Sequence, residues 1–337
     1  MSLLTEADEV STIAFGYMGS KALFNALELG IFTALADGAK DTAALSAETG
    51  APAERLRTLL TALSGLGLVA LKDGAWVNAP AADAFLAKGA KYDFGDYLRL
   101  QVGRQMYSLI DQIDDALSGA PADEHVTSYA DWFSDEGEAR LYSESQHAGS
   151  LGPARQLAKS LDLAGATSLL DVGGGTGAFA ITLCERNPQL TATVVEFENV
   201  AALGRRYVEE AGLSDRVRYV VGDGREDIWP KGQDVVLMSY LFSGVPAEAH
   251  GTLVRRAFDH LVPGGTFVVH DFLVHPDRSG PRLAALWQLQ HMAFTPDGRS
   301  LTSRDVTGLM EAAGFEDIEV APMIPELTMT VRGRRPA

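Results

Sequence analysis

A glycine-rich loop is the most informative feature of this 337-residue sequence. The residues from Asp171 to Gly177 read Asp-Val-Gly-Gly-Gly-Thr-Gly, and they lie between an apolar run typical of a strand and a segment typical of a helix. Glycines at such a junction let a ligand approach the backbone at the amino end of the helix. Glu196 lies 23 residues after Gly173, where a carboxylate can hold ribose hydroxyls. The pattern predicts a ligand that contains a nucleoside.

The residues beside the glycines distinguish two kinds of ligand. Asp171 precedes the first glycine by two residues; a carboxylate there is unhelpful beside a pyrophosphate but suits a ligand with an amino group. Ala178 stands where the dinucleotide fingerprint expects its third glycine, which is tolerated but less typical. The loop therefore favours an amino-bearing nucleoside over a dinucleotide, with a dehydrogenase or a simple turn as the alternatives.

Three later motifs complete a family resemblance. They are Glu196, Gly222-Asp223 after the third strand of the second half, and Leu261–Gly265 before the fifth. With the glycine loop they resemble class I S-adenosylmethionine-dependent methyltransferases, specifically the O-methyltransferase-like branch with an N-terminal winged-helix dimerisation domain. The resemblance covers nearly the whole chain and implies a Rossmann-like domain with a mixed seven-stranded sheet, S-adenosylmethionine as methyl donor, and a homodimer. The donor-binding residues that it implies are Asp171, Gly173, Gly175, Glu196, Asp223 and Ser239.

The general base of this family is missing from the sequence. Members that methylate hydroxyls usually carry a His-Asp-Trp box after the fourth strand, and here Ser243, Gly244 and Val245 stand in its place. A serine has no useful pKa near 7, so general-base catalysis by that residue is lost. The nearby His250 is interpreted as an exposed helix residue, and His270-Asp271 at the end of a strand as structural.

Three acceptors remain open without the histidine. A thioether sulfur has no proton to lose, so methyl transfer to it needs only placement and a dry pocket. An α-keto acid carbon would need a base or a metal, for which His291 is the one remaining candidate ligand. A small aromatic hydroxyl could react by proximity alone. The residues fit the thioether best, and no metal is expected.

Four segments resemble a narrower group, the bacterial methylthiohydroxybutyrate S-methyltransferases of dimethylsulfoniopropionate synthesis. This resemblance implies conversion of 4-methylthio-2-hydroxybutyrate, a small carboxylate thioether, to its dimethylsulfonio product. The segments are Tyr92–Gln101, Leu141–Ser150, Ser239–Pro246 and Leu286–His291.

Several side chains are candidates for the acceptor pocket. Tyr142 and Gln146 lie one helical turn apart, as do Trp287 and His291, and these four are expected to position the acceptor. His147 lies beside them in the sequence, and a pocket residue and a helix-end residue are equally good interpretations of it. Aromatic faces can stabilise a sulfonium by about 0.5–2 kcal/mol each. Further candidates for binding the substrate are Tyr97, Arg104, Tyr240 and Ser243, with Arg104 as partner of a carboxylate.

The first part of the chain is predicted to be mainly helical. One long helical stretch spans Ile13–Leu35, with apolar residues on more than one face, so it is either an interior helix or a subunit interface. Asp41 caps a helix Thr42–Thr49. A second helix follows Pro52, and an Asp-Gly turn then closes a hairpin, which is the winged-helix pattern. A further helix over Gly95–Gly119 would place Tyr97, Gln101 and Arg104 on one polar face.

The second half alternates strands and helices, which predicts a parallel sheet with crossover helices and an α/β fold. Two final strands, Ile318–Met323 and Leu327–Arg332, have a short connection and are expected to pair antiparallel. We therefore predict a dimerisation domain at residues 1–119, a connection and pocket helix at 120–150, and a donor-binding domain at 151–337.

Composition limits the function classes. The 45 acidic and 28 basic side chains give a net charge of −17, which disfavours nucleic acid as a partner. A donor-sensing, DNA-binding regulator is the alternative from another class. The absence of a long apolar run and of a basic leader predicts a cytoplasmic protein without membrane contact. Cys184 is the only cysteine, which excludes an intramolecular disulfide.

Overall fold

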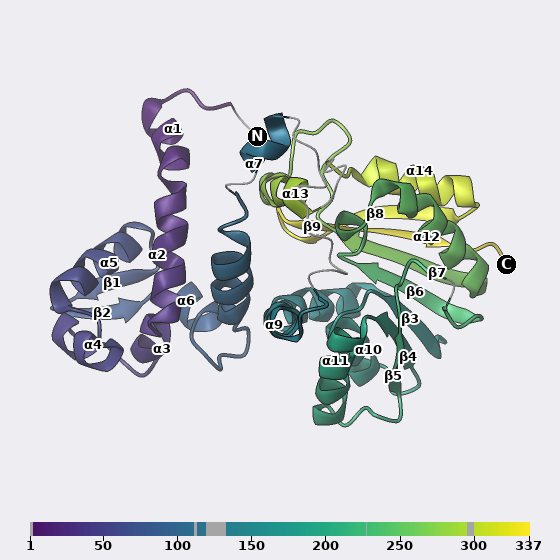
Figure 1. Ribbon diagram of the computed structural model, residues 1–337, viewed down its shortest axis with the longest axis horizontal. Helices are drawn as coiled ribbons and strands as arrows, with labels where there is room; N and C mark the ends of the chain where they lie inside the picture. The colour runs from purple at the N-terminus through teal and green to yellow at the C-terminus, as the bar shows by residue number, and fades with distance from the viewer. Residues whose placement is uncertain (1–2, 111–112, 119–132, 227, 295–299) are drawn as a thin grey trace. The chain divides into compact units, whose positions relative to one another are not determined.

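The computed structural model divides the chain into two compact units, Met1–Tyr107 and Ser108–Ala337 (Figure 1). It describes residues 3–110, 113–118, 133–226, 228–294 and 300–337. The first part of the predicted connection and pocket helix, residues 120–132, lies outside the described residues, and so does residue 119, where the preceding helix was predicted to end.

The first unit is helical with one small hairpin. A cluster of buried apolar side chains, including Phe32, Leu60 and Trp76, forms its core. Its elements are α1 (Ala7–Ala14), α2 (Gly16–Glu28), α3 (Ile31–Ala36), α4 (Thr42–Thr49), α5 (Ala53–Gly65), β1 (Val69–Lys72), β2 (Ala75–Asn78), α6 (Pro80–Phe85) and the π-helix η1 (Tyr97–Met106).

Local sequence signals set most of these boundaries. The Asp41 side chain accepts a hydrogen bond from the Ala44 amide at 2.7 Å, as a capping residue does. Gly50 ends α4 with a positive φ of 73°, which glycine adopts without steric cost. The antiparallel pairing of β1 with β2 confirms the predicted hairpin.

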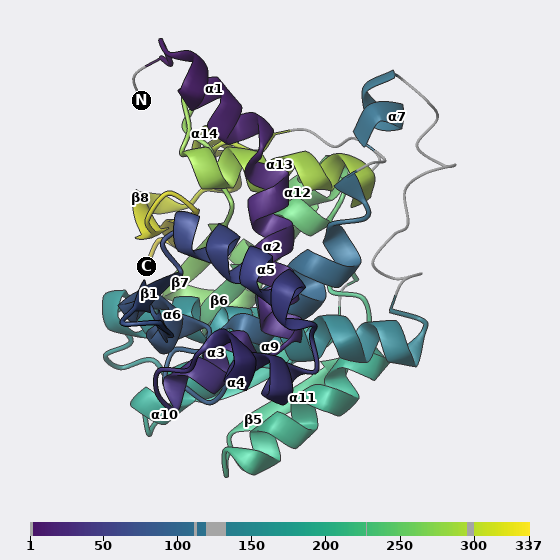
Figure 2. The ribbon, with the colours of Figure 1, turned by 90° about the vertical axis from the view of Figure 1, so that its left-hand side faces the viewer.

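Two predicted helices differ from the structure. The stretch Ile13–Leu35 is divided among α1, α2 and α3, which follow one another along the purple ribbon (Figure 2). Its first part is not interior, because Ile13 and Phe15 are exposed. The stretch predicted as an α-helix from Gly95 is the π-helix η1, in which hydrogen bonds run from residue i to i+5. Gln101 is accordingly buried while Arg104 is exposed, so the predicted common face is wrong.

The second unit is built on a seven-stranded sheet. Its strand order is β5-β4-β3-β6-β7-β9-β8, with β9 antiparallel to both of its neighbours and the other pairs parallel. The predicted mixed sheet and α/β class are confirmed. The strands are β3 (Ser168–Val172), β4 (Thr191–Glu196), β5 (Val217–Val221), β6 (Gln233–Ser239), β7 (Leu261–Asp271), β8 (Glu316–Ile324) and β9 (Thr328–Arg334).

Helices cover both faces of this sheet (Figure 1). Residues of α9, α10 and α11 belong to one buried apolar cluster, and residues of α12 and α14 belong to the other. The helix α9 continues past residue 150, where the sequence suggested a segment boundary. The helices are α7 (Ile113–Ser118), α9 (Glu136–Ser160), α10 (Ala178–Arg186), α11 (Glu198–Glu210), η4 (Phe242–Gly244), α12 (Ala247–His260), α13 (Arg282–Phe294) and α14 (Ser303–Ala313).

Candidate functional site

The glycine loop lies between β3 and α10, at the carboxyl edge of the sheet. The backbone turns through positive φ at Gly173 (65°) and Gly175 (56°), which favours glycine at both positions. A Cβ atom on Gly174 would lie 2.6 Å from the Asp171 carboxyl group. The loop therefore needs glycine both for its conformation and for the close approach of Asp171.

Glu196, the last residue of β4, holds this loop directly. Its Oε2 atom accepts a hydrogen bond from the Gly175 amide at 3.0 Å, and Oε1 accepts one from the Phe197 amide at 2.8 Å. Burial raises the pKa of Glu196 to about 7, although these two hydrogen bonds oppose the shift. The structure thus joins the two predicted donor motifs through one carboxylate.

Asp171 is fully buried at the end of β3. Among the described residues no donor has hydrogen-bond geometry to either carboxylate oxygen, and the nearby Ala180 amide only partly opposes the rise in the pKa of this group. Burial and then the negative charge of Glu196 raise its pKa to about 7. A buried carboxylate without partners is costly unless a ligand pairs with it, so these residues fit a donor with a cationic amino group and a ribose.

Two contacts from outside the predicted set also hold the loop. His147 on α9 is hydrogen-bonded through Nδ1 to the Thr176 hydroxyl at 2.7 Å, and its ring stacks on Tyr207 at 3.9 Å. Burial lowers the pKa of His147 to about 4, so the ring is neutral near pH 7. The Tyr219 hydroxyl donates to the Gly175 carbonyl at 3.1 Å. His147 is thus a loop contact inside α9 and not a helix-end residue.

The other two predicted donor residues have partners of their own. Asp223 forms an ion pair with Arg225 at 2.6 Å; although burial raises its pKa, the hydrogen bonds from Arg225 give a net lowering. The Ser239 hydroxyl is 2.8 Å from Nδ1 of His270. His270 is fully buried, which lowers its pKa to about 3. The donor-binding roles of Asp223 and Ser239 stay predictions.

Three aromatic rings from separate elements form what we call the aromatic stack. Tyr240 follows β6, Phe272 follows β7 and Trp287 lies on α13. The Tyr240 and Phe272 ring centroids are 4.9 Å apart, and those of Phe272 and Trp287 are 4.7 Å apart, with nearly parallel planes. The Tyr240 ring also lies 6.4 Å from that of Phe179 in the first turn of α10, directly after the glycine loop. The stack therefore neighbours the donor loop.

Ser243 lies in the loop after Tyr240 and contacts a buried carboxylate. Its amide donates to Oδ2 of Asp271 at 3.1 Å. His250 is buried and not exposed as predicted, because its Nε2 atom is 2.8 Å from the Phe242 carbonyl. The loop that replaces the family's histidine box is thus fixed by β7 on one side and by α12 on the other.

The remaining candidates in the second unit lie on α9 and α13. Tyr142 packs against Phe133 at 5.0 Å. The Oε1 atom of Gln146 is buried and has no hydrogen-bond partner in the described part of the chain. His291 is buried, which lowers its pKa to about 4. Their roles around the acceptor stay predictions.

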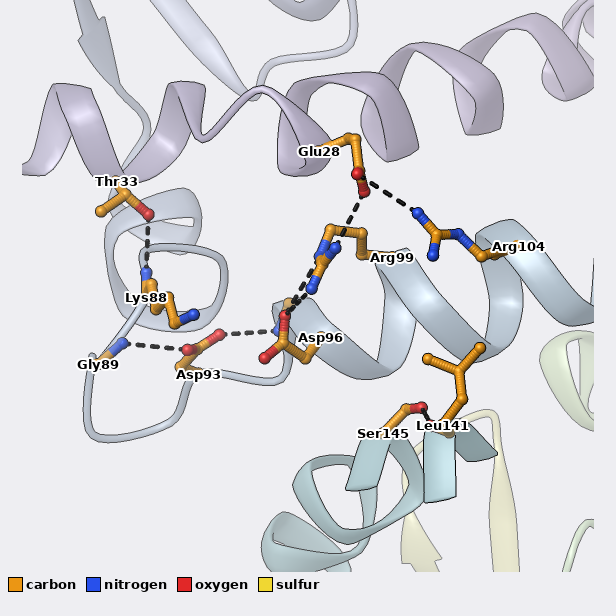
Figure 3. Close-up of polar contacts among 11 residues, drawn as sticks. Glu28, Thr33, Lys88, Gly89, Asp93, Asp96, Arg99, Arg104, Leu141 and Ser145 are labelled. Carbon is orange, nitrogen blue, oxygen red and sulfur yellow. Dashed lines mark hydrogen bonds and ion pairs between the residues drawn. The ribbon is translucent and has the colours of Figure 1, made fainter. Parts of the chain in front are cut away.

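Tyr97 and Arg104 belong to the first unit, on η1. Arg104 forms an ion pair with Glu28 at 3.4 Å, and Arg99 pairs with the same carboxylate at 3.0 Å (Figure 3). The role of Arg104 as a carboxylate anchor stays a prediction, as does the role of Tyr97.

No group of three or more His, Cys, Asp and Glu side chains among the described residues is arranged to hold a metal ion. No helix among them is both long enough and apolar enough to cross a membrane.

Comparison with known proteins agrees with this geometry. Residues 120–316 match the O-methyltransferase domain, and residues 11–88 match the O-methyltransferase dimerisation domain. The human N-acetylserotonin methyltransferase, solved in complex with S-adenosylmethionine, shares the fold with a TM-score of 0.85 at 24% identity, over 100% of both chains.

Two bacterial relatives match over almost their full lengths. The chain is 30% identical to the 3-hydroxy-5-methyl-1-naphthoate 3-O-methyltransferase of Streptomyces sahachiroi, over 92% of this chain and 89% of that one. It is 26% identical to the tetracenomycin polyketide synthesis 8-O-methyl transferase TcmO of Streptomyces glaucescens, over 97% and 96%. The chain therefore belongs to the S-adenosylmethionine-dependent O-methyltransferase family, with both the dimerisation and the catalytic domain of that family.

Proposed function

We propose that this methyltransferase acts on a hydroxyl group of a small aromatic acceptor. The observation that carries the proposal is the near-full-length match to a relative named for methylation of a hydroxynaphthoate. The aromatic stack supports it, because the partly exposed rings of Tyr240 and Trp287, which pack on the buried Phe272, offer flat apolar surface near the donor loop. This proposal replaces thioether methylation as the preferred function.

The chain's residues divide into a donor set and an acceptor set. S-adenosylmethionine supplies an electrophilic methyl group on a positively charged sulfur. Asp171 would pair with its amino group and Glu196 would accept hydrogen bonds from its ribose hydroxyls. Tyr142, Gln146, Trp287 and His291 would surround the acceptor and exclude water, so that the acceptor oxygen is held in line with the methyl group.

Thioether S-methylation, with 4-methylthio-2-hydroxybutyrate as substrate, is the second candidate. It is favoured by Ser243 in place of a histidine base and by the unpartnered Oε1 atom of Gln146, which can accept a hydrogen bond from the substrate hydroxyl. The relatives reported above are both named for transfer to oxygen, so this candidate ranks below the first.

A methyl-transfer assay with labelled S-adenosylmethionine separates the candidates. The acceptors are a hydroxynaphthoate, a catechol, 4-methylthio-2-hydroxybutyrate and an α-keto acid, with mass detection of each product. We expect turnover of a hydroxyaromatic and none of the thioether. Turnover of the thioether alone would reject the proposal in favour of the second candidate.

His147 is expected to increase the affinity for the donor, because its hydrogen bond to Thr176 holds the glycine loop. In His147→Phe, a ring remains to stack on Tyr207, but the hydrogen bond to Thr176 is lost. A net hydrogen bond contributes about 0.5–1.5 kcal/mol, so the dissociation constant for S-adenosylhomocysteine should rise by roughly 3- to 10-fold in calorimetry. His275→Phe, on an exposed loop, is the control. An unchanged constant in His147→Phe would remove this residue from the donor site.

We further propose that the first unit mediates a homodimer through an apolar surface on α1 and α2. Ile13, Phe15 and Met18 are 69%, 63% and 53% exposed there. In Phe15→Glu a charge replaces apolar surface. The dissociation constant of the dimer, measured by analytical ultracentrifugation, should therefore rise about tenfold. Leu71→Glu, 56% exposed on β1, is the matched control. Equal behaviour of the two variants would place the interface elsewhere.

A further inference from the structure

Asp271 and Ser243 form a pair that joins the end of β7 to the loop after Tyr240; the sequence drew attention to each residue but not to their contact. Asp271 is the last residue of β7 and is fully buried, while Ser243 is only partly buried. The Asp271 carboxylate accepts hydrogen bonds from the amides of Phe272 at 2.8 Å and Ser243 at 3.1 Å, and from the Ser243 side chain. A partly accessible hydroxyl is therefore hydrogen-bonded to a carboxylate that solvent does not reach.

The surroundings make this carboxylate a better base than an ordinary aspartate. No Lys or Arg side chain forms an ion pair with Asp271 among the residues that the structure describes. Burial raises the pKa of Asp271, and the hydrogen bonds from Ser243 and Phe272 offset the shift only in part. A general base is most effective when its pKa approaches the working pH.

The titratable neighbours do not compete for this role. His270 and His291 are buried, with pKa values lowered to about 3 and about 4, which makes both rings weak proton acceptors, and Nδ1 of His270 already contacts the Ser239 hydroxyl. The ring of His250 is engaged with the Phe242 carbonyl. Asp271 is thus the carboxylate next to the loop that replaces the family's histidine.

The pair also lies next to the aromatic stack along the chain. Phe272 directly follows Asp271, and Tyr240 precedes Ser243 by three residues on the same loop. The backbone thus links the pair to two rings of the aromatic stack.

We propose that Ser243 and Asp271 form a proton relay that takes the place of the histidine base. The inference rests on the proposed hydroxyl acceptor. In the step, the acceptor O–H proton moves to the Ser243 oxygen, and the Ser243 proton moves to the Asp271 carboxylate. The acceptor oxygen forms a bond to the methyl carbon, the sulfur–carbon bond breaks, and its electron pair stays on sulfur. Asp271 later releases the proton to water through Ser243.

Asp271→Asn tests the relay with two acceptors of different acidity. With a phenol that is neutral at the assay pH, kcat should fall about 100-fold, within the range for general-base catalysis. With a nitrophenol that is already ionised, the loss should shrink to less than about threefold. The acid limb of the wild-type kcat–pH profile should disappear in the variant. Binding of S-adenosylhomocysteine, measured by calorimetry, should be unchanged.

Two variants of Ser243 test the relay independently, in case Asp271→Asn loses activity because it does not fold. Ser243→Ala keeps the carboxylate and should lose about tenfold in kcat on the neutral phenol only, whereas Ser243→Thr keeps a hydroxyl and should restore most of it. Asp277→Asn on an exposed loop is the matched charge control.

The outcomes separate the relay from the proposed function. Equal losses of Asp271→Asn on both phenols, or an unchanged pH profile, would mean that Asp271 only supports the loop, and would overturn the relay alone. A wild-type enzyme that turns over neither phenol would overturn the proposed function, and the relay with it.

Discussion

Glu196→Ala should weaken the binding of S-adenosylmethionine by about 100- to 10,000-fold. The variant removes the acceptor for the ribose hydroxyls, and it also leaves the Gly175 and Phe197 amides without the carboxylate that they now contact. Hydrogen bonds to a charged group contribute about 1.5–3 kcal/mol each, and 1.4 kcal/mol corresponds to tenfold, so the loss of two gives this range. Calorimetry with S-adenosylhomocysteine measures it directly.

A neighbouring glutamate provides the control for this experiment. Glu198 is two residues further on, and its exposed side chain contacts Arg205 at 3.3 Å, so Glu198→Ala should bind the donor like the wild type. Glu196→Gln keeps one acceptor oxygen and should fall between the two. If Glu196→Ala folds normally by circular dichroism and still binds within tenfold of the wild type, Glu196 does not hold the ribose.

The sequence was sufficient for the parts of the fold that depend on local patterns. The bounds of α4 agree with the predicted helix, and β3 lies at the apolar run that predicted a strand before the glycine loop, because capping residues and apolar runs are recognised from neighbouring positions. The loop from Asp171 to Gly177 was equally predictable, since its glycines are required by the local backbone. The glycine loop of the donor site is therefore the part of the candidate site that is most predictable from the sequence.

The π-helix η1 could not be predicted in the same way. The apolar spacing after Gly95 fits an α-helix, yet the structure has i to i+5 hydrogen bonding, as from the Tyr107 amide to the Val102 carbonyl. A Cβ atom on Gly103 would lie only 2.7 Å from the ring of Phe24 on α2. This close approach to a distant residue is a tertiary contact, which local periodicity does not report, and it overrides the local preference.

Pairs that are distant in sequence account for the other misses. His147 and Thr176 are 29 residues apart, and Ser243 and Asp271 are 28 apart. Each pair forms because the carboxyl ends of parallel strands meet at one edge of the sheet, where loops and helix residues converge. The residue types were visible in the sequence, but a single sequence contains no signal that pairs them.

The coupling of Asp171 and Glu196 is a further distant effect, and it predicts that donor affinity depends on pH. Without the donor, burial raises the pKa of each carboxyl group to about 7. Because a raised carboxyl pKa makes the folded state bind protons that the unfolded chain has already lost, these two groups lower the free energy of unfolding as pH rises from about 4 to 7. The protein without donor should therefore lose stability over that range from this source.

Donor binding should reverse this preference, because the ionised carboxylates are the forms that pair with the amino group and accept from the ribose. Binding then lowers both pKa values and releases protons, so the affinity rises with pH. Two groups with a pKa of 7 that remain ionised in the complex give at most about a 100-fold change between pH 6 and 8; since the charge of Glu196 supplies part of the shift of Asp171, we expect between about 10- and 100-fold. Calorimetry at several pH values, in buffers of different ionisation enthalpy, measures both the affinity and the protons released.

Asp171→Asn removes one of the two ionisations, so its affinity should be weaker and less dependent on pH. The donor's own amino group titrates equally in both experiments and cancels in the comparison. A wild-type affinity that is flat from pH 6 to 8, or an equal slope in the variant, would show that this buried carboxylate pair does not control donor binding.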